Sequence, residues 1–258
     1  MNNENDYNIL DCESFQSTLS SLEQIFNTSQ KEIINFIENF YLENVYESSI
    51  NEIKSNEMLY HEFKKNFTID SKEIQPFWFH TTRVKFGTSF KEGIYPLDVA
   101  LPLIDKQIEN IVSGLGLQKN PLDSRLCDNV KTKLNCNGNS GPWGFLIKEV
   151  CFHNIGSSHN YCVIPEVVDD IVYSKYSSNY SAIIKKFQEL TTPCIVKFST
   201  GEIFHPDNLF YVLNYIYQKY HHIKFDRKSI YPYCNRGQII KYEMIKSIEF
   251  LDSEKLHF

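Results

Sequence analysis

The first 75 residues contain neither glycine nor proline, although the 258-residue chain has ten glycines and nine prolines. These two residues most often interrupt regular structure, so a stretch without them favours helices joined by short polar turns. The same region is strongly acidic, because residues 1–70 carry a formal charge of −9 and residues 71–258 one of +3. We therefore expect an all-helical region at 1–72 and a second domain at 73–258.

Long apolar runs and several well-known motifs are also missing. No stretch reaches the roughly 18 apolar residues of a transmembrane helix, and the acidic N-terminus is unlike a secretory leader. The seven cysteines form no Cys-x-x-Cys pair, which is typical of free thiols in a reducing compartment. We expect a cytoplasmic protein that makes no membrane contact. The absence of glycine-rich phosphate loops and of Gly-x-Ser-x-Gly leaves no support for P-loop, Rossmann or serine hydrolase classes.

Apolar spacing supports helices in the acidic region. Ser29 and Glu32 form a capping-box pattern that is followed by apolar residues at helical spacing. A shorter helix is expected at about 13–26 and a less regular one at about 50–63. Two interpretations stay open: the helices are a cap that packs on the main domain, or residues 1–70 bind a protein partner or inhibit the rest of the chain.

After residue 72, strand and helix patterns are interspersed without the strict rhythm of a parallel βαβ fold. Aromatic and β-branched residues predict strands, and amphipathic runs predict helices between them. We therefore expect an α+β fold. The predicted strands are 77–82, 143–152, 160–164, 193–198, 238–242 and 247–251, and the predicted helices are 165–173, 180–190, 206–221 and one that Asp98 caps and Gly114 ends.

The segment that carries chemistry begins with His80-Thr81-Thr82-Arg83, at the end of the first predicted strand. After a short connection, Gly93-Ile94-Tyr95-Pro96 opens a second predicted strand. A histidine held on a strand can bond a sugar hydroxyl, a threonine hydroxyl can bridge to the same ligand, and an arginine offers a planar fork to a pyrophosphate. A histidine that ends a core strand and bonds a backbone carbonyl would give the same pattern, so that interpretation stays open.

This order of strand, His-x-Thr and Gly-Ile-x-Pro resembles the first half of the ADP-ribosyltransferase fold, including its nucleic-acid-directed toxins and the tRNA 2′-phosphotransferases. The resemblance implies that NAD is bound as a substrate, without a metal, by His80, Thr81, Thr82 and Arg83. It also implies a nucleic-acid or protein acceptor for ADP-ribose. A composition with 22 lysines and only four arginines is typical of AT-rich bacterial genomes, and together with the resemblance it implies a toxin or a phage-defence protein.

The remaining site residues of that family have candidates later in the chain. Tyr173 and Tyr180 are candidates for the tyrosine that stacks on nicotinamide. The family's glutamate lies on a late strand, where this chain has Gln238, which keeps the hydrogen bonding and loses the charge. Glu166 is the alternative acid, although its position at a helix start also fits capping. The resemblance thus implies an ADP-ribosyltransferase, and Gln238 leaves a non-catalytic nucleotide- or protein-binding module as the alternative.

Cysteines and histidines also gather within 36 residues of the middle of the chain. Zinc sites usually draw on four converging ligands with short, paired spacings such as Cys-x-x-Cys. Here only Cys151-x-His153 and His159-x-x-Cys162 resemble ligand pairs. We therefore expect no metal. The residues are Cys127, Cys136, Cys151, His153, His159 and Cys162.

Overall fold

The structure is a computed structural model, and it divides the chain into two compact units that are each built from separate segments. Unit 1 comprises residues 1–78, 145–156 and 199–231, and unit 2 comprises residues 79–144, 157–198 and 232–258. The expected 73–258 domain therefore contributes to both units, and each unit is described by itself. The structure describes residues 7–40, 55–117, 128–135, 140–152, 160–225 and 229–252.

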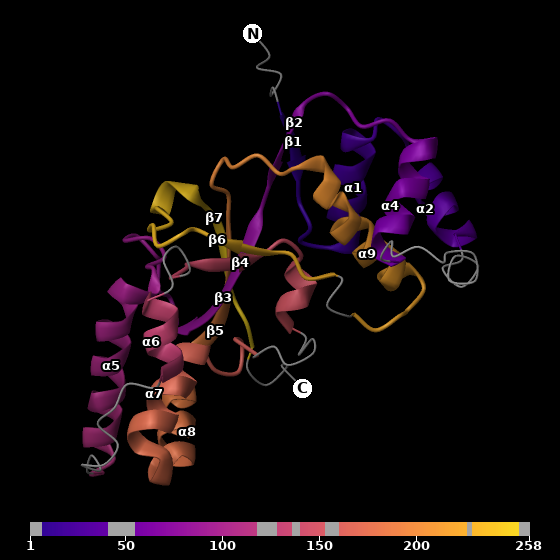
Figure 1. Cartoon of the computed structure of the whole chain (residues 1–258). Coiled ribbons are helices and arrows are strands. Elements are labelled where there is room, and N and C mark those ends of the chain that lie inside the picture. Colours follow the sequence, from indigo (N-terminus) through magenta and orange to yellow (C-terminus); the bar gives the residue numbers. More distant parts are fainter. Residues whose placement is uncertain are drawn as a thin grey trace. The chain divides into compact units, whose positions relative to one another are not determined.

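Helices make up most of unit 1, as the absence of glycine and proline predicts. The predicted capping box is confirmed, because the Ser29 hydroxyl accepts the Glu32 N–H and the Glu32 carboxylate accepts the Ser29 N–H. The helix predicted at 206–221 is also confirmed, and a short 3-10 turn, η4 (Pro206–Asn208), precedes it. The helices are α1 (Phe15–Ile25), α2 (Gln30–Asn39), α4 (Ser55–Asn66) and α9 (Leu209–Tyr220) (Figure 1).

The N-terminal region is not all helical, and this part of the prediction is wrong. Strand β1 (Tyr7–Leu10) pairs in parallel with β2 (Glu73–Pro76). Alternate side chains of β1 are buried, which is the periodicity of a strand with one face on a core. A four-residue alternation is too short to be recognised along the sequence, and the partner strand lies far away in the chain.

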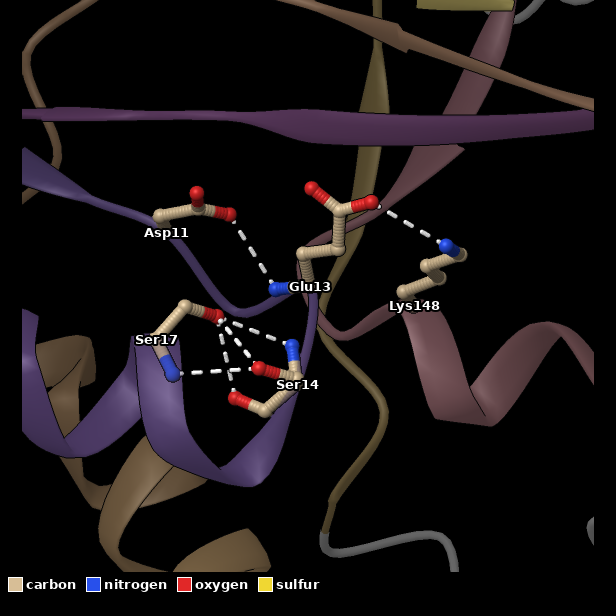
Figure 2. A network of polar contacts seen from close by, with 5 residues as sticks. All are labelled: Asp11, Glu13, Ser14, Ser17 and Lys148. Carbon is tan, nitrogen blue, oxygen red and sulfur yellow. Dashed lines mark hydrogen bonds and ion pairs between the residues drawn. The ribbon is translucent and has the colours of Figure 1, made fainter. Parts of the chain in front are cut away.

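A polar network surrounds the start of α1 (Figure 2). The Ser14 hydroxyl accepts the Ser17 N–H at 3.1 Å, and the Ser17 hydroxyl accepts the Ser14 N–H at 2.9 Å. Asp11 accepts the Glu13 N–H at 3.1 Å, and Lys148 pairs with the Glu13 carboxylate at 3.1 Å. Lys148 begins the 3-10 helix η2 (Lys148–Phe152), where a strand was predicted. The ion pair therefore links the first and second segments of unit 1.

Aromatic residues fill the core of unit 1. Phe63 of α4 is fully buried and meets Phe26 and Phe36 edge-on, with ring centroids 4.8 Å and 5.0 Å apart. Tyr215 of α9 is also fully buried, and its hydroxyl donates to the Glu149 carboxylate at 3.1 Å. The described part of residues 1–70 thus contributes core side chains to unit 1, as the packing interpretation expects.

A five-stranded sheet forms the centre of unit 2, and its strand order is β6-β4-β3-β5-β7. The predicted strands at 77–82, 193–198 and 247–251 are confirmed as β3, β5 and β7. Strand β7 pairs with β5 in the antiparallel direction. The strands are β3 (Trp78–Val84), β4 (Trp143–Phe145), β5 (Thr192–Phe198), β6 (Pro232–Cys234) and β7 (Ile245–Phe250).

The helices of unit 2 lie side by side (Figure 1), and α5 (Leu97–Gly114), α7 (Glu166–Tyr176) and α8 (Tyr180–Leu190) share an apolar core of their own. Lys175 of α7 is buried, and its ammonium contacts both carboxylate oxygens of Asp105 at 2.7 Å. The helices predicted at 165–173 and 180–190 are confirmed. Asp98 does not cap its helix, because Pro96 occupies the N-cap position and no side chain caps it. The helices are α5 (Leu97–Gly114), α6 (Asp128–Asn135), α7 (Glu166–Tyr176) and α8 (Tyr180–Leu190).

Three predicted strands of unit 2 are absent from the described residues. The segment 160–164 forms a turn, and neither Gly93–Pro96 nor 238–242 becomes a strand. The last two meet in one isolated antiparallel bridge, between Ile94 and Ile240. A tight turn just before Gln238 and a 3-10 turn, η6 (Tyr242–Met244), restrict the second segment to that one bridge.

Replacement of Gly93 by alanine tests this bridge. Gly93 has φ +86°, and an added Cβ would lie 2.3 Å from the Ile240 carbonyl oxygen. We expect Gly93→Ala to lower the free energy of unfolding by about 2–4 kcal/mol, because backbone has to move. Gly114→Ala is the matched control, since its Cβ would meet nothing within 4 Å at the end of α5. Equal urea denaturation midpoints for the two variants would contradict the close approach.

Candidate functional site

Strand β3 separates its four motif residues onto two faces. Burial alternates along it, so that Thr81 and Arg83 are buried whereas His80 and Thr82 are half-buried. Successive side chains of a strand point to opposite faces. His80 and Thr82, the two ends of the His-x-Thr pattern, therefore share one face, and Thr81 and Arg83 share the other.

The imidazole of His80 is fixed by the first residue of β4. Its Nδ1 lies 2.7 Å from the carbonyl oxygen of Trp143. A carbonyl can only accept, so Nδ1 carries the proton and Nε2 has the lone pair when the ring is neutral. Desolvation lowers the pKa of His80, and the bond to Trp143 opposes this shift. The ring is therefore neutral at pH 7, with Nε2 as an acceptor. The backbone-carbonyl contact is the one that the alternative interpretation of this histidine expects.

Arg83 has its contacts inside unit 2. Its guanidinium donates to the Cys162 carbonyl at 2.7 Å and to the Gln188 carbonyl at 3.1 Å. It also donates to both the carbonyl and the hydroxyl of Thr191, at 2.9 Å and 3.2 Å. Three of these four oxygens belong to the C-terminal end of α8 and the residue after it, where a cation is favourable. Arg83 is 8% exposed, so this placement gives no support to the predicted pyrophosphate contact.

Backbone hydrogen bonds bring other parts of the predicted site toward His80. Residues 141–142, directly before Trp143, accept from Gly237 at 2.7 Å and from Asn235 at 3.0 Å. Ile94 and Ile240 exchange two bonds, at 2.9 Å and 3.1 Å. The His-x-Thr strand, the Gly93–Pro96 segment and the turn that leads to Gln238 are therefore linked through β4 and this bridge.

Gln238 itself is exposed and ends a tight turn, Asn235–Gln238. Its N–H donates to the Asn235 carbonyl at 2.9 Å, and the Asn235 side-chain amide donates to the Gln238 carbonyl at 2.7 Å. Arg236 and Gly237 have φ of +50° and +81°, the values of a type I′ hairpin turn. The prediction of a strand at 238–242 is therefore wrong, and the segment meets Gly93–Pro96 only at the bridge between Ile94 and Ile240.

The other three candidates belong to the α7–α8 hairpin. Glu166 is the first residue of α7 and accepts from the Tyr161 hydroxyl at 3.2 Å. Tyr180, the first residue of α8, donates to Asp169, and burial together with Asp169 raises its pKa to about 12. Tyr173 is 69% exposed on α7. The described hydrogen bonds of these side chains go to residues of this hairpin and its approach, and none reaches His80.

Trp143 and Arg236 are the residues of this region that sequence reasoning missed. The only signals are a tryptophan directly after Gly141-Pro142, one of two in the chain, and an arginine in an Asn-x-Gly turn pattern. Trp143 contacts His80 through its carbonyl. Arg236 comes near Trp143 only because β4 pairs with β6, and these strands lie far apart in the sequence.

The described residues offer no metal site. Within the described ranges no three histidine, cysteine, aspartate or glutamate residues are placed to hold a metal ion, and no helix there could cross a membrane. Cys127, Cys136, His153 and His159 lie outside the described residues.

Comparison of the chain with protein-family models, with curated proteins and with solved structures found no match.

Replacing Arg83 tests its internal role. Arg83→Lys keeps the charge, but an ammonium cannot reach the four oxygens of the planar fork. We expect the free energy of unfolding to fall by about 2–4 kcal/mol, because buried carbonyls lose their donors. Arg236→Lys is the matched control at an exposed position and should change stability by about 0.5 kcal/mol or less. Urea unfolding of both variants measures the difference, and equal losses would contradict the assignment.

The lowered pKa of His80 predicts that the folded protein loses stability in acid. Its pKa in the folded protein lies below 6.5, so the unfolded chain takes up the proton first as the pH falls. Folding therefore loses stability below about pH 6.5, and none of this loss occurs above it. His80→Gln does not titrate and should lose less stability than wild type between about pH 7 and pH 5.5. The readout is the free energy of unfolding at the two pH values, with His205→Gln as the control at an exposed histidine. Parallel pH profiles of wild type and His80→Gln would contradict a neutral His80.

Proposed function

We propose that this chain is an NAD-using enzyme of the ADP-ribosyltransferase type, which cleaves the bond between nicotinamide and ribose. ADP-ribose would then pass to a nucleic acid, a protein or water, in the bacterial toxin or phage-defence setting that the sequence resemblance implies. NAD is a substrate in this proposal, and no metal takes part.

The shared face of His80 and Thr82 carries the proposal. A neutral imidazole with its Nδ1 held by Trp143 presents Nε2 as an acceptor for a ribose hydroxyl. Thr82 adds a hydroxyl on the same face of β3, where it can donate to or accept from the same ligand. Because both groups stand on a central strand, their geometry is set by the sheet rather than by a loop.

The chemistry asked of the site is limited. The C1′–N bond breaks, its electron pair leaves with the nicotinamide, and positive charge spreads over C1′ and the ring oxygen of the ribose. An acceptor then attacks C1′ and loses its proton to solvent or to a basic group. His80 and Thr82 hold the ribose hydroxyls, so that C1′ faces the acceptor. Gln238, whose amide oxygen carries a partial negative charge, is the group we assign to the developing positive charge.

Nicotinamide release tests this function. Purified full-length protein is incubated with NAD, with and without total cell nucleic acid and extract, and released nicotinamide is measured. We expect release by wild type and a fall of about 100-fold or more in His80→Ala, because positioning and proton contacts at the ribose are lost. His205→Ala is the control, since it removes an exposed histidine of unit 1.

The two negative outcomes have different meanings. Equal release by wild type and His80→Ala would remove β3 from the site. No release in any mixture, from protein whose circular dichroism shows a folded chain, would overturn the enzyme and leave the alternative function. That alternative is a non-catalytic module that binds a nucleotide or a protein, and the exposed, uncharged Gln238 in the place of a glutamate is the observation that favours it.

A further inference from the structure

We propose that Trp143 and Arg236 form a nucleotide-recognition pair, in which the indole stacks on a heterocyclic ring and the guanidinium binds a phosphate. The inference deepens the proposed function, because it assigns the ring and phosphate contacts of the same site. The ligand class is a nucleotide, and neither residue belongs to the His-x-Thr pattern.

Trp143 is held firmly by its backbone while its side chain faces solvent. Trp143 is 45% exposed, and its carbonyl receives the bond from His80 at 2.7 Å. Gly141 lies against the indole edge: an added Cβ there would be 2.9 Å from Trp143 Cδ1. Its φ of +71° also favours glycine. A large aromatic surface that is fixed at its base and open to water is a platform on which flat rings can stack.

Arg236 adopts an unfavourable backbone conformation, and its guanidinium has no partner among the residues that the structure describes. Its φ of +50° is the left-handed conformation, which glycine and asparagine adopt more readily than arginine. Its side chain is exposed, and no ion pair or hydrogen bond joins its guanidinium to any described residue. Asn or Gly at this position would give the turn a lower conformational free energy. A guanidinium presented in this way fits a phosphate, which it can bind with two parallel hydrogen bonds.

The two residues are neighbours across paired backbone. The bonds from Asn235 to Pro142 and from Gly237 to Gly141, at 3.0 Å and 2.7 Å, flank Arg236 on both sides. The backbone of Arg236 therefore lies against the two residues that directly precede Trp143. An aromatic residue and a cationic residue on paired backbone match a ligand with a flat ring and an anionic group. Such a pair also supplies the phosphate contact that the buried Arg83 does not offer.

Tryptophan fluorescence gives a direct test in the full-length protein. The chain has two tryptophans, and Trp78 is only 3% exposed, so quenching by iodide reports mainly on Trp143. We expect ADP to protect the fluorescence from iodide, with adenosine and pyrophosphate each protecting only at concentrations about tenfold or more higher. Arg236→Ala should weaken the ADP effect about tenfold and leave the adenosine effect unchanged.

Two variants control the assignment. Lys246→Ala removes one positive charge from β7, at the opposite edge of the sheet from β6, and should bind ADP as wild type does. Trp143→Phe should remove most of the quenchable signal, and its ADP affinity, measured by calorimetry, should fall several-fold because the smaller ring stacks less. No protection by ADP, or equal losses in Arg236→Ala and Lys246→Ala, would overturn the proposal. Nicotinamide release without ADP protection would refute this pair and not the enzyme, whereas ADP protection without release would refute the enzyme and not this pair.

Discussion

A guanidinium buried at the end of a strand needs acceptors inside the protein, because an unsatisfied buried charge costs several kcal/mol. Arg83 finds them in the Cys162 carbonyl before α7 and in oxygens of Gln188 and Thr191 at the end of α8. One set of hydrogen bonds therefore joins β3, the turn before α7 and the end of α8. In return, Arg83 supplies donors to carbonyls that the end of a helix leaves without partners. The α7–α8 hairpin of unit 2 is thus tied to β3 by one side chain.

The same strand, β3, also sets the orientation of His80 and Thr82. Because side chains alternate along β3, burying Thr81 and Arg83 turns His80 and Thr82 to the other face. The Trp143 carbonyl then fixes the imidazole and its tautomer. A slip of one residue along the strand would turn His80 and Thr82 to the buried face and Thr81 and Arg83 to the other face. The structural and the proposed chemical residues are thus specified by one register.

The sequence predicts local features of this chain well and long-range pairing poorly. The capping box at Ser29, the helix 180–190 and the strand at 193–198 all follow from spacing within about ten residues. Strand β1 and the bridge from Ile94 to Ile240 depend on partners far along the chain, so no local pattern predicts them. The site divides in the same way. His80 and Thr82 could be chosen from a short motif, whereas Trp143 and Arg236 become candidates only through the pairing of β4 with β6.

The charges of the proposed site around His80, Gln238 and Arg236 favour binding an anion over stabilising a cation. In the proposed site, a neutral His80 and an uncharged Gln238 would bring no negative charge to a ribose, and Arg236 would add a positive one. Phosphate binding gains from this balance, while an oxocarbenium-like ribose is stabilised only by oriented dipoles, which act more weakly than a carboxylate. Slow transfer and tight nucleotide binding are therefore compatible in one site. Glu243, the acid nearest to Gln238 in the sequence, lies 4.0 Å from Lys241. Because its side chain is exposed, solvent screens its charge, and it would contribute little to a reaction at His80.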